Sequence, residues 1–255
     1  MPQFSSDGIA ISYAVYGAGP PVLLIHGFAS SGRINWVDTG WVDTLTAAGY
    51  QAITLDNRGH GESRKLYDPQ LYFAHEMAED ARRLLDHLGI DRAAVLGYSM
   101  GARLAAFFAL NHPDRVAAAV FGGMGLNLIA GLDDSEAIIA ALQAERIETI
   151  TSAVGLMFRR FAEQTGSDRA ALAACMIHSR EPMAEADVRR IAVPVLVAVG
   201  SADGMAGAPE PLVALLPAAE GFVIDGRDHM KGTGDRSFKA RTLDFLARQP
   251  AWSRL

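Results

Sequence analysis

The sequence is almost without cysteine: Cys175 is the single one among 255 residues. One thiol cannot form an internal disulfide, and a metal site built from several thiolates is not expected. Long apolar runs are missing too. The longest, such as IAVPVLVAVG, reach about ten residues, well short of the roughly 20 that span a bilayer. The sequence therefore gives no indication of an oxidising compartment or of a membrane-spanning segment.

Basic runs and a targeting segment are also absent. The net charge is −6, and no dense run of Lys or Arg indicates a surface for nucleic acid. The opening MPQFSSDGIAISY lacks the basic start and the apolar stretch of a signal peptide. We therefore expect a cytoplasmic protein whose partner is a small molecule, with no nucleic-acid or membrane partner. The sequence does not fix the oligomeric state.

The residues that are present predict a protein with a substantial core, because half of them are apolar. The stretch IAISYAVYG alternates apolar and polar residues, which is typical of a half-exposed strand in an antiparallel hairpin. Continuous apolar runs are typical of strands buried on both faces of a parallel sheet. Six such runs occur, at residues 20–27, 51–56, 93–97, 116–123, 193–200 and 221–225.

Amphipathic helical patterns lie between these runs, at residues 76–89, 100–112 and 238–249. Alternating buried strands and helices predict a doubly wound, mostly parallel α/β sheet with right-handed crossovers. Residues 124–190 interrupt the alternation, because they contain helix-like stretches and no strand pattern. We expect a single domain, with residues 1–123 and 191–255 as the α/β core and residues 124–190 as an inserted helical cap.

The pentapeptide GYSMG at residues 97–101 follows one predicted strand and precedes a predicted helix. A serine on such a strand–turn–helix can act as a nucleophile, and glycines at 97 and 101 let the chain segments approach closely. The helix N-terminus adds partial positive charge where an oxyanion would form. We therefore predict that Ser99 is a catalytic nucleophile.

A serine nucleophile needs a base and an acid that orients the base. Asp203 follows the predicted strand VPVLVAVG, and His229 follows GFVID, so both lie beyond carboxyl ends of strands, where open parallel sheets place functional groups. Asp225 and Asp228 are competing acids, but the acid must approach His229 from a separate loop. We predict a triad of Ser99, Asp203 and His229.

An oxyanion hole would complete this site. One backbone N–H is expected from Met100, directly after the nucleophile, and the other from Phe28, in the loop after the strand that ends at His26 and Gly27. His26 and His60 are expected to brace loops by hydrogen bonding rather than to act as bases.

At this point the chain resembles the α/β-hydrolase family over essentially its whole length. The matching residues are HGF at 26–28, DNRGHGES at 56–63, GYSMG at 97–101, GSAD at 200–203 and GRDH at 226–229. The resemblance implies an eight-stranded core, a mobile helical cap, a structural role for DNRGHGES, and no metal or organic cofactor. The chain departs from many members at Arg227, in a place where they carry histidine.

Methionines are frequent in the cap and in the loops near the predicted site, which favours an apolar acyl or alcohol group on the substrate. Candidate substrate contacts are Met124, Met157, Met230 and the cap residue His178. Arg159 and Arg160 could hold a carboxylate, although an exposed helix face is the simpler interpretation.

The sequence thus predicts a serine hydrolase that cleaves a carboxylic ester or a similar acyl compound through an acyl-enzyme. A hydrolase of carbon–carbon bonds in ring-cleavage products and a small lactonase share the same triad and stay open, as do a perhydrolase and a lyase. A ligand receptor with little turnover is the non-enzymatic alternative. Dehalogenases and epoxide hydrolases are disfavoured, because both carry an aspartate where Ser99 stands.

Overall fold

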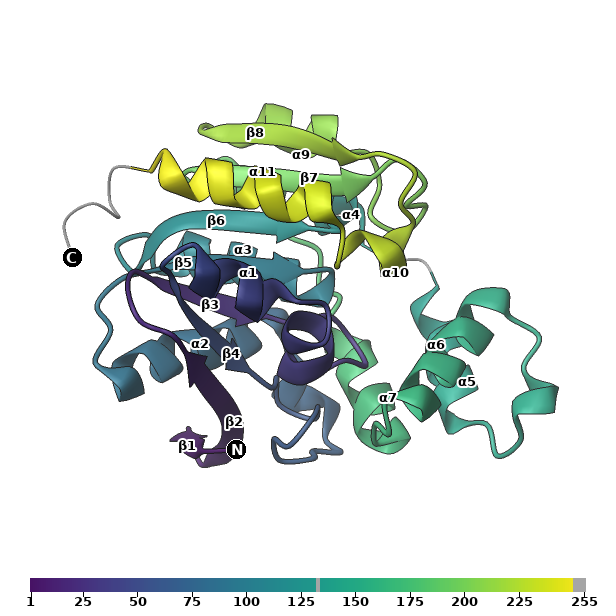
Figure 1. Ribbon diagram of the computed structural model, residues 1–255. Coiled ribbons are helices and arrows are strands. Elements are labelled where there is room, and N and C mark those ends of the chain that lie inside the picture. The colour runs from purple at the N-terminus through teal and green to yellow at the C-terminus, as the bar shows by residue number, and fades with distance from the viewer. Residues whose placement is uncertain (132–133, 250–255) are drawn as a thin grey trace.

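The computed structural model describes residues 1–131 and 134–249 of the chain. The predicted cap and core ranges also include residues 132, 133 and 250–255, which lie outside the described residues. Within them the chain forms one eight-stranded sheet with the order β1-β2-β4-β3-β5-β6-β7-β8 (Figure 1). The strands are β1 (Gln3–Ser6), β2 (Ile9–Tyr16), β3 (Pro21–Ile25), β4 (Gln51–Leu55), β5 (Ala93–Tyr98), β6 (Val116–Gly122), β7 (Val195–Gly200) and β8 (Ala219–Ile224).

The six neighbouring strands β4, β3, β5, β6, β7 and β8 are parallel, and β2 pairs antiparallel with both β4 and β1. This arrangement confirms the predicted hairpin at one edge and the predicted mostly parallel core. Strands β3, β5, β6 and β7 are buried at every position. The prediction that residues 221–225 form a buried interior strand is wrong, because among the described strands β8 pairs with β7 alone, and it leaves Val223 exposed.

Helices cover both faces of the sheet (Figure 1). Successive strand residues point to opposite faces. Val22 and Leu24 pack in the core beneath α1 (Trp41–Ala47) and α11 (Arg236–Ala247). Leu23 and Ile25 pack in the core beneath α2 (Ala74–Leu88) and α3 (Met100–Asn111). The remaining described elements of the core are two helical turns and two short helices. Their bounds are η1 (Arg33–Val37), η2 (Pro69–Tyr72), α9 (Pro209–Leu215) and α10 (His229–Gly232).

The segment between β6 and β7 contains helices and no strand in its described part, and we call it the helical insertion. It comprises α4 (Asn127–Ala130), α5 (Ser135–Gln143), η3 (Ile147–Thr149), α6 (Ala153–Gln164), α7 (Arg169–His178) and α8 (Glu185–Val188). In Figure 1, α5, α6 and α7 lie beyond the carboxyl ends of the parallel strands, apart from the sheet. Across residues 1–131 and 134–249, no helix has the length and apolar character needed to cross a membrane.

A buried side chain on α3 ties the helical insertion to the core. Arg103 donates to the carbonyl oxygens of Asn127 (2.7 Å) and Leu128 (2.9 Å), at the start of the insertion, and of Glu181 (2.6 Å), near its end. Burial and the nearby guanidinium of Arg180 lower the pKa of Arg103 to about 9. These carbonyl contacts hold both ends of the insertion against the helix that follows Ser99.

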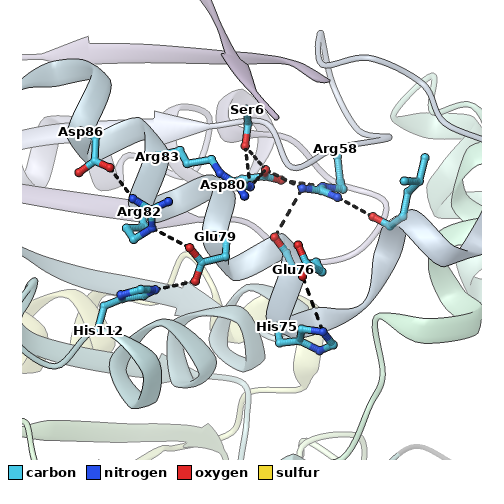
Figure 2. A network of polar contacts seen from close by, with 11 residues as sticks. Ser6, Arg58, His75, Glu76, Glu79, Asp80, Arg82, Arg83, Asp86 and His112 are labelled. Atoms are coloured by element: carbon cyan, nitrogen blue, oxygen red, sulfur yellow. Dashed lines mark hydrogen bonds and ion pairs between the residues drawn. The ribbon is translucent and has the colours of Figure 1, made fainter. Parts of the chain in front are cut away.

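A second buried network fixes the loop DNRGHGES after β4 (Figure 2). The guanidinium of Arg58 forms two hydrogen bonds of 2.7 Å to the two carboxylate oxygens of Asp80 on α2, and both side chains are almost wholly buried. Ser6 on β1 also donates to Asp80. A buried ion pair is strongly destabilising to break, because the remaining charge has no partner. Arg58 therefore anchors this loop, as the resemblance implied.

Candidate active site

Ser99 lies at the sharp turn between β5 and α3. Its backbone has φ +55° and ψ −118°, a conformation that a residue with a side chain adopts only under strain. A methyl group on Gly97 would overlap the backbone of Gly101, and one on Gly101 would overlap the carbonyl of Ile25. The two glycines of GYSMG thus let the turn form, and the turn presents Ser99 beyond the end of β5.

Three side chains meet here from three separate strand ends. His229 Nε2 lies 2.9 Å from Ser99 Oγ, and His229 Nδ1 lies 2.8 Å from Asp203 Oδ2. Asp203 is buried, and its other oxygen, Oδ1, accepts from the backbone N–H groups of Met205 (2.9 Å) and Ala206 (3.0 Å). The three predicted residues therefore form one continuous hydrogen-bonded chain.

The competing acids lie elsewhere. The Asp228 carboxylate accepts from the backbone N–H of Lys231 (2.8 Å) at the start of α10, and this bond contributes most to its lowered pKa. Asp225 is exposed. Asp203 is thus the acid in contact with the imidazole of His229.

The loop after β3 is fixed by buried side chains. His26 Nδ1 lies 2.7 Å from the Gly27 carbonyl oxygen, and His26 Nε2 lies 2.9 Å from the backbone nitrogen of Asn57. These partners define a neutral imidazole that donates through Nδ1 and accepts at Nε2. Burial lowers the pKa of His26 to about 4. His26 thus braces the loop, as predicted, and places Phe28 beside Ser99 in the wall of the same cavity.

This cavity has a volume of about 140 Å³ and is mostly apolar. Aromatic rings of Phe28, Phe158 and Phe161 lie along it, the last two from α6 of the helical insertion. The full lining is Gly27, Phe28, Ser30, Ile34, Asn35, Thr39, Tyr98, Ser99, Phe158, Phe161, His229, Met230 and Thr233. An apolar pocket that ends at a serine–histidine pair can hold an acyl or alcohol chain against the serine oxygen.

Comparisons with known proteins agree with this architecture. The model of the alpha/beta hydrolase fold family matches residues 20–146. A crystal structure of a hydrolase from Pseudomonas aeruginosa PA01 has a TM-score of 0.79 to this chain at 25% identity, covering 96% of this chain and 97% of that one. The chain belongs to the α/β-hydrolase fold family.

Two sequence relatives of this α/β-hydrolase fold protein are named epoxide hydrolases. Epoxide hydrolase 2 of Siraitia grosvenorii is 40% identical over 116 residues, which are 46% of this chain and 36% of that protein. Soluble epoxide hydrolase of Corynebacterium sp. (strain C12) is 32% identical over 174 residues, 62% of this chain and 57% of that protein. The chain therefore spans about a third to just over half of the length of these relatives.

The predicted substrate contacts are only partly found at the cavity of this α/β-hydrolase fold protein. Met230 lines it, but Met124 is buried in the core and Met157 packs against the core. The ring of His178 stacks on Phe73, with the ring centroids 4.1 Å apart. Met124, Met157 and His178 are therefore not among the residues that line the cavity.

The two arginines considered as carboxylate partners also lie elsewhere. Arg159 is buried and donates to the carbonyl oxygens of Ala141 (3.0 Å) and Ala144 (2.7 Å), at the end of α5, while Arg160 is exposed. Sequence reasoning missed Asn35, Tyr98, Phe158 and Phe161 in the lining. The spacing of the two phenylalanines, one helical turn apart, was the available signal for an apolar face on α6.

Proposed function

We propose that this protein is a serine hydrolase that cleaves carboxylic esters through an acyl-enzyme, with Ser99, His229 and Asp203 as its catalytic triad. The observation that carries the proposal is the unbroken chain of contacts Asp203–His229–Ser99, 2.8 and 2.9 Å long, at the wall of an apolar cavity. This geometry matches the roles of acid, base and nucleophile in acyl transfer.

In the proposed reaction, Ser99 Oγ attacks the ester carbonyl while His229 Nε2 takes its proton. Asp203 keeps the Nδ1–H tautomer in place and stabilises the positive imidazolium. The backbone N–H groups of Phe28 and Met100 are the proposed donors to the oxyanion. His229 then protonates the leaving alcohol. Water activated by the same imidazole hydrolyses the acyl-enzyme, which releases the acid and restores the Ser99 hydroxyl.

Ester cleavage is favoured over epoxide opening by the identity of the nucleophile. A carboxylate that opens an epoxide forms an ester, and water can cleave that ester to release the diol. The Ser99 oxygen would instead form an ether, which water does not cleave under these conditions. The names of the sequence relatives therefore do not transfer to this site, where the residue on the turn is a serine.

The lining favours a neutral, apolar substrate. Phe28, Phe158, Phe161 and Met230 line the cavity together with Ser99, and the exposed lining is mostly apolar. A ring-cleavage product carries a carboxylate, which needs a cationic partner. Arg159 is buried and bonded to carbonyl oxygens at the end of α5, and Arg160 is exposed. We therefore place a simple ester ahead of a carbon–carbon bond substrate.

The first test is labelling with a fluorophosphonate probe, followed by mass mapping of the modified peptide. Turnover is then measured on p-nitrophenyl esters from acetyl to decanoyl, with Ser99→Ala as the paired variant. Labelling at Ser99 and a chain-length optimum are expected. Loss of the nucleophile should lower kcat by at least ~10³-fold. Labelling at another residue, or wild-type turnover by Ser99→Ala, would refute the proposal.

A further inference from the structure

A second cavity lies beside the apolar one at Ser99. It has a volume of about 530 Å³, and two residues, Ser30 and Ile34, line both cavities. Most of its other lining residues are polar or charged, among them Arg33 and Glu62. We call the apolar cavity at Ser99 the inner cavity and this second one the outer cavity.

The two cavities follow one another between α6 of the helical insertion and the loop after β3. On α6, Phe161 lines the inner cavity and Thr165, at the end of the helix, lines the outer one. These residues are one helical turn apart, roughly 6 Å along the helix axis. Across from them, Phe28 lines only the inner cavity and Ser31 only the outer one. The boundary between the cavities therefore lies at Ser30 and Ile34.

Ile34 is the larger of the two residues at this boundary. It lies on η1, is partly exposed, and its backbone N–H donates to Ser31 Oγ at 3.2 Å. Ser30, the other residue, is small and buried. Replacement of Ile34 by alanine would take most of the side-chain atoms out of the boundary. The width of the passage between the two cavities therefore depends mainly on Ile34.

The inner cavity has room for a short acyl chain only. An apolar cavity of about 150 Å³ holds one benzene molecule, so the inner cavity, at about 140 Å³, holds a group of about six carbon atoms. A p-nitrophenyl group is larger than benzene. In a p-nitrophenyl ester of a short acid, the acyl chain is therefore the part that fits.

We propose that Ile34 sets the upper limit on acyl-chain length, so that the site takes esters of short acids with up to about six carbons. This inference rests on the proposed acyl-enzyme chemistry and names the acyl class of that site. A longer chain attached to Ser99 meets the Ile34 side chain before it reaches the outer cavity. One methylene too many for an apolar pocket lowers kcat/KM by about 10- to 200-fold.

The test compares p-nitrophenyl octanoate with p-nitrophenyl butyrate. Both acyl chains are plain alkyl groups with carbonyls of nearly equal reactivity, so the octanoate-to-butyrate ratio of kcat/KM reports how well the longer chain fits. In the unmodified protein, octanoate should be at least about 10-fold poorer than butyrate. Ile34→Ala opens the boundary, so its ratio should rise by about 10-fold or more. Ile34→Trp narrows the boundary and should lower the ratio of hexanoate to acetate.

Val37→Ala is the matched control. Val37 lies on the same helical turn and packs against the core, and it is not among the described residues that line either cavity. This substitution shortens a neighbouring aliphatic side chain, so it tests whether loosening of η1 alone admits longer chains. Its ratio should match that of the unmodified protein. Ile34→Leu keeps the side-chain volume and should also keep octanoate the poorer substrate.

Equal kcat/KM for octanoate and butyrate in the unmodified protein would overturn the role of Ile34. An unchanged ratio in Ile34→Ala, or the same rise in Val37→Ala, would overturn it as well. Each of these results is compatible with fluorophosphonate labelling at Ser99 and ester turnover, so the proposed hydrolase would stand. Absence of labelling and of turnover in the unmodified protein would instead remove the proposed function and, with it, this inference.

Discussion

The Asp203 carboxylate divides its two oxygens between the His229 imidazole and its own loop. Oδ2 lies 2.8 Å from His229 Nδ1, while Oδ1 accepts two backbone N–H groups, from Met205 and Ala206. The loop bonds prevent the carboxylate from rotating. The oxygen that faces His229 is therefore fixed, and so is the tautomer of the imidazole.

Asp203→Asn should remove nearly all activity without unfolding the protein. The two loop N–H groups require an oxygen, so the amide nitrogen would take the position that faces His229 Nδ1. His229 Nδ1 would then have to accept a hydrogen bond from this amide, so the imidazole proton would lie on Nε2. A protonated Nε2 cannot take the proton of Ser99. We expect kcat to fall by about 10⁴-fold, measured on the best ester substrate. A loss below tenfold would mean that Asp203 is not the acid.

Tyr98→Phe should lower kcat with little change in KM. The Tyr98 hydroxyl donates to the His229 carbonyl at 2.7 Å, and burial raises its pKa, so it remains a donor across the working pH range. Loss of this bond frees the loop that holds the imidazole, and small displacements of a base can cost up to about 100-fold in rate. Steady-state kinetics on one ester gives both constants.

The control for Tyr98→Phe is Tyr72→Phe, which removes a similar bond away from the site. Tyr72 is buried, and its hydroxyl donates to the Leu66 carbonyl at 2.8 Å. Each substitution should lower the free energy of unfolding by about 1 kcal/mol. Only Tyr98→Phe should lower kcat. Equal kcat in the two variants would assign Tyr98 a role in stability alone.

Gly101→Ala should destabilise the fold through a backbone collision. The added methyl would overlap the Ile25 carbonyl and would lie 2.7 Å from the His26 carbonyl oxygen. Neither group can move without disturbing β3 or the loop that carries Phe28. We expect the free energy of unfolding in urea to fall by roughly 2–3 kcal/mol. Gly204→Ala is the matched control, because a methyl there meets no atom within 4 Å.

Acid should destabilise the fold through two buried histidines. Burial lowers the pKa of His26 to about 4, and burial together with the neighbouring His26 lowers that of His60 to about 3. The unfolded chain protonates both near pH 6.5, whereas the folded chain does not. The free energy of unfolding should therefore fall below pH 6.5, by up to about 1.4 kcal/mol per pH unit for each histidine, until the folded pKa is reached.

His60→Phe separates the two contributions to this pH dependence. Below pH 6, the slope of unfolding free energy against pH should fall by about half, because one of the two neutral histidines is gone. His87→Gln replaces an exposed histidine and should leave the slope nearly unchanged. An unaltered slope in His60→Phe would mean that His60 binds its proton in the folded protein.

The sequence predicted that three side chains of the site meet, because each of them lies just beyond a strand end. Ser99, Asp203 and His229 each follow an apolar run, and the carboxyl ends of parallel strands meet at one edge of a sheet. The same reasoning failed for β8, since an apolar stretch does not reveal whether its strand has one neighbour or two. It also did not place Met124, Met157 and His178, which lie outside the cavity lining, because the lining depends on how the insertion packs.

Asn35 illustrates a different limit. Nothing in the sequence around it indicates a place in the cavity lining. It lies there because η1 packs against the loop after β3, where Asn35 Oδ1 accepts from the backbone N–H of Gly27. Such a contact between a side chain and a distant loop exists only in the folded chain.

Arg103 links the helical insertion to the turn at Ser99 through a single helix. Its guanidinium donates to carbonyl oxygens of Asn127 and Leu128 near the start of the insertion and of Glu181 near its end. Arg103 lies on α3, which begins directly after Ser99. The same helix therefore sets both the position of this serine and the place where the insertion, with the two cavity-lining phenylalanines of α6, joins the core.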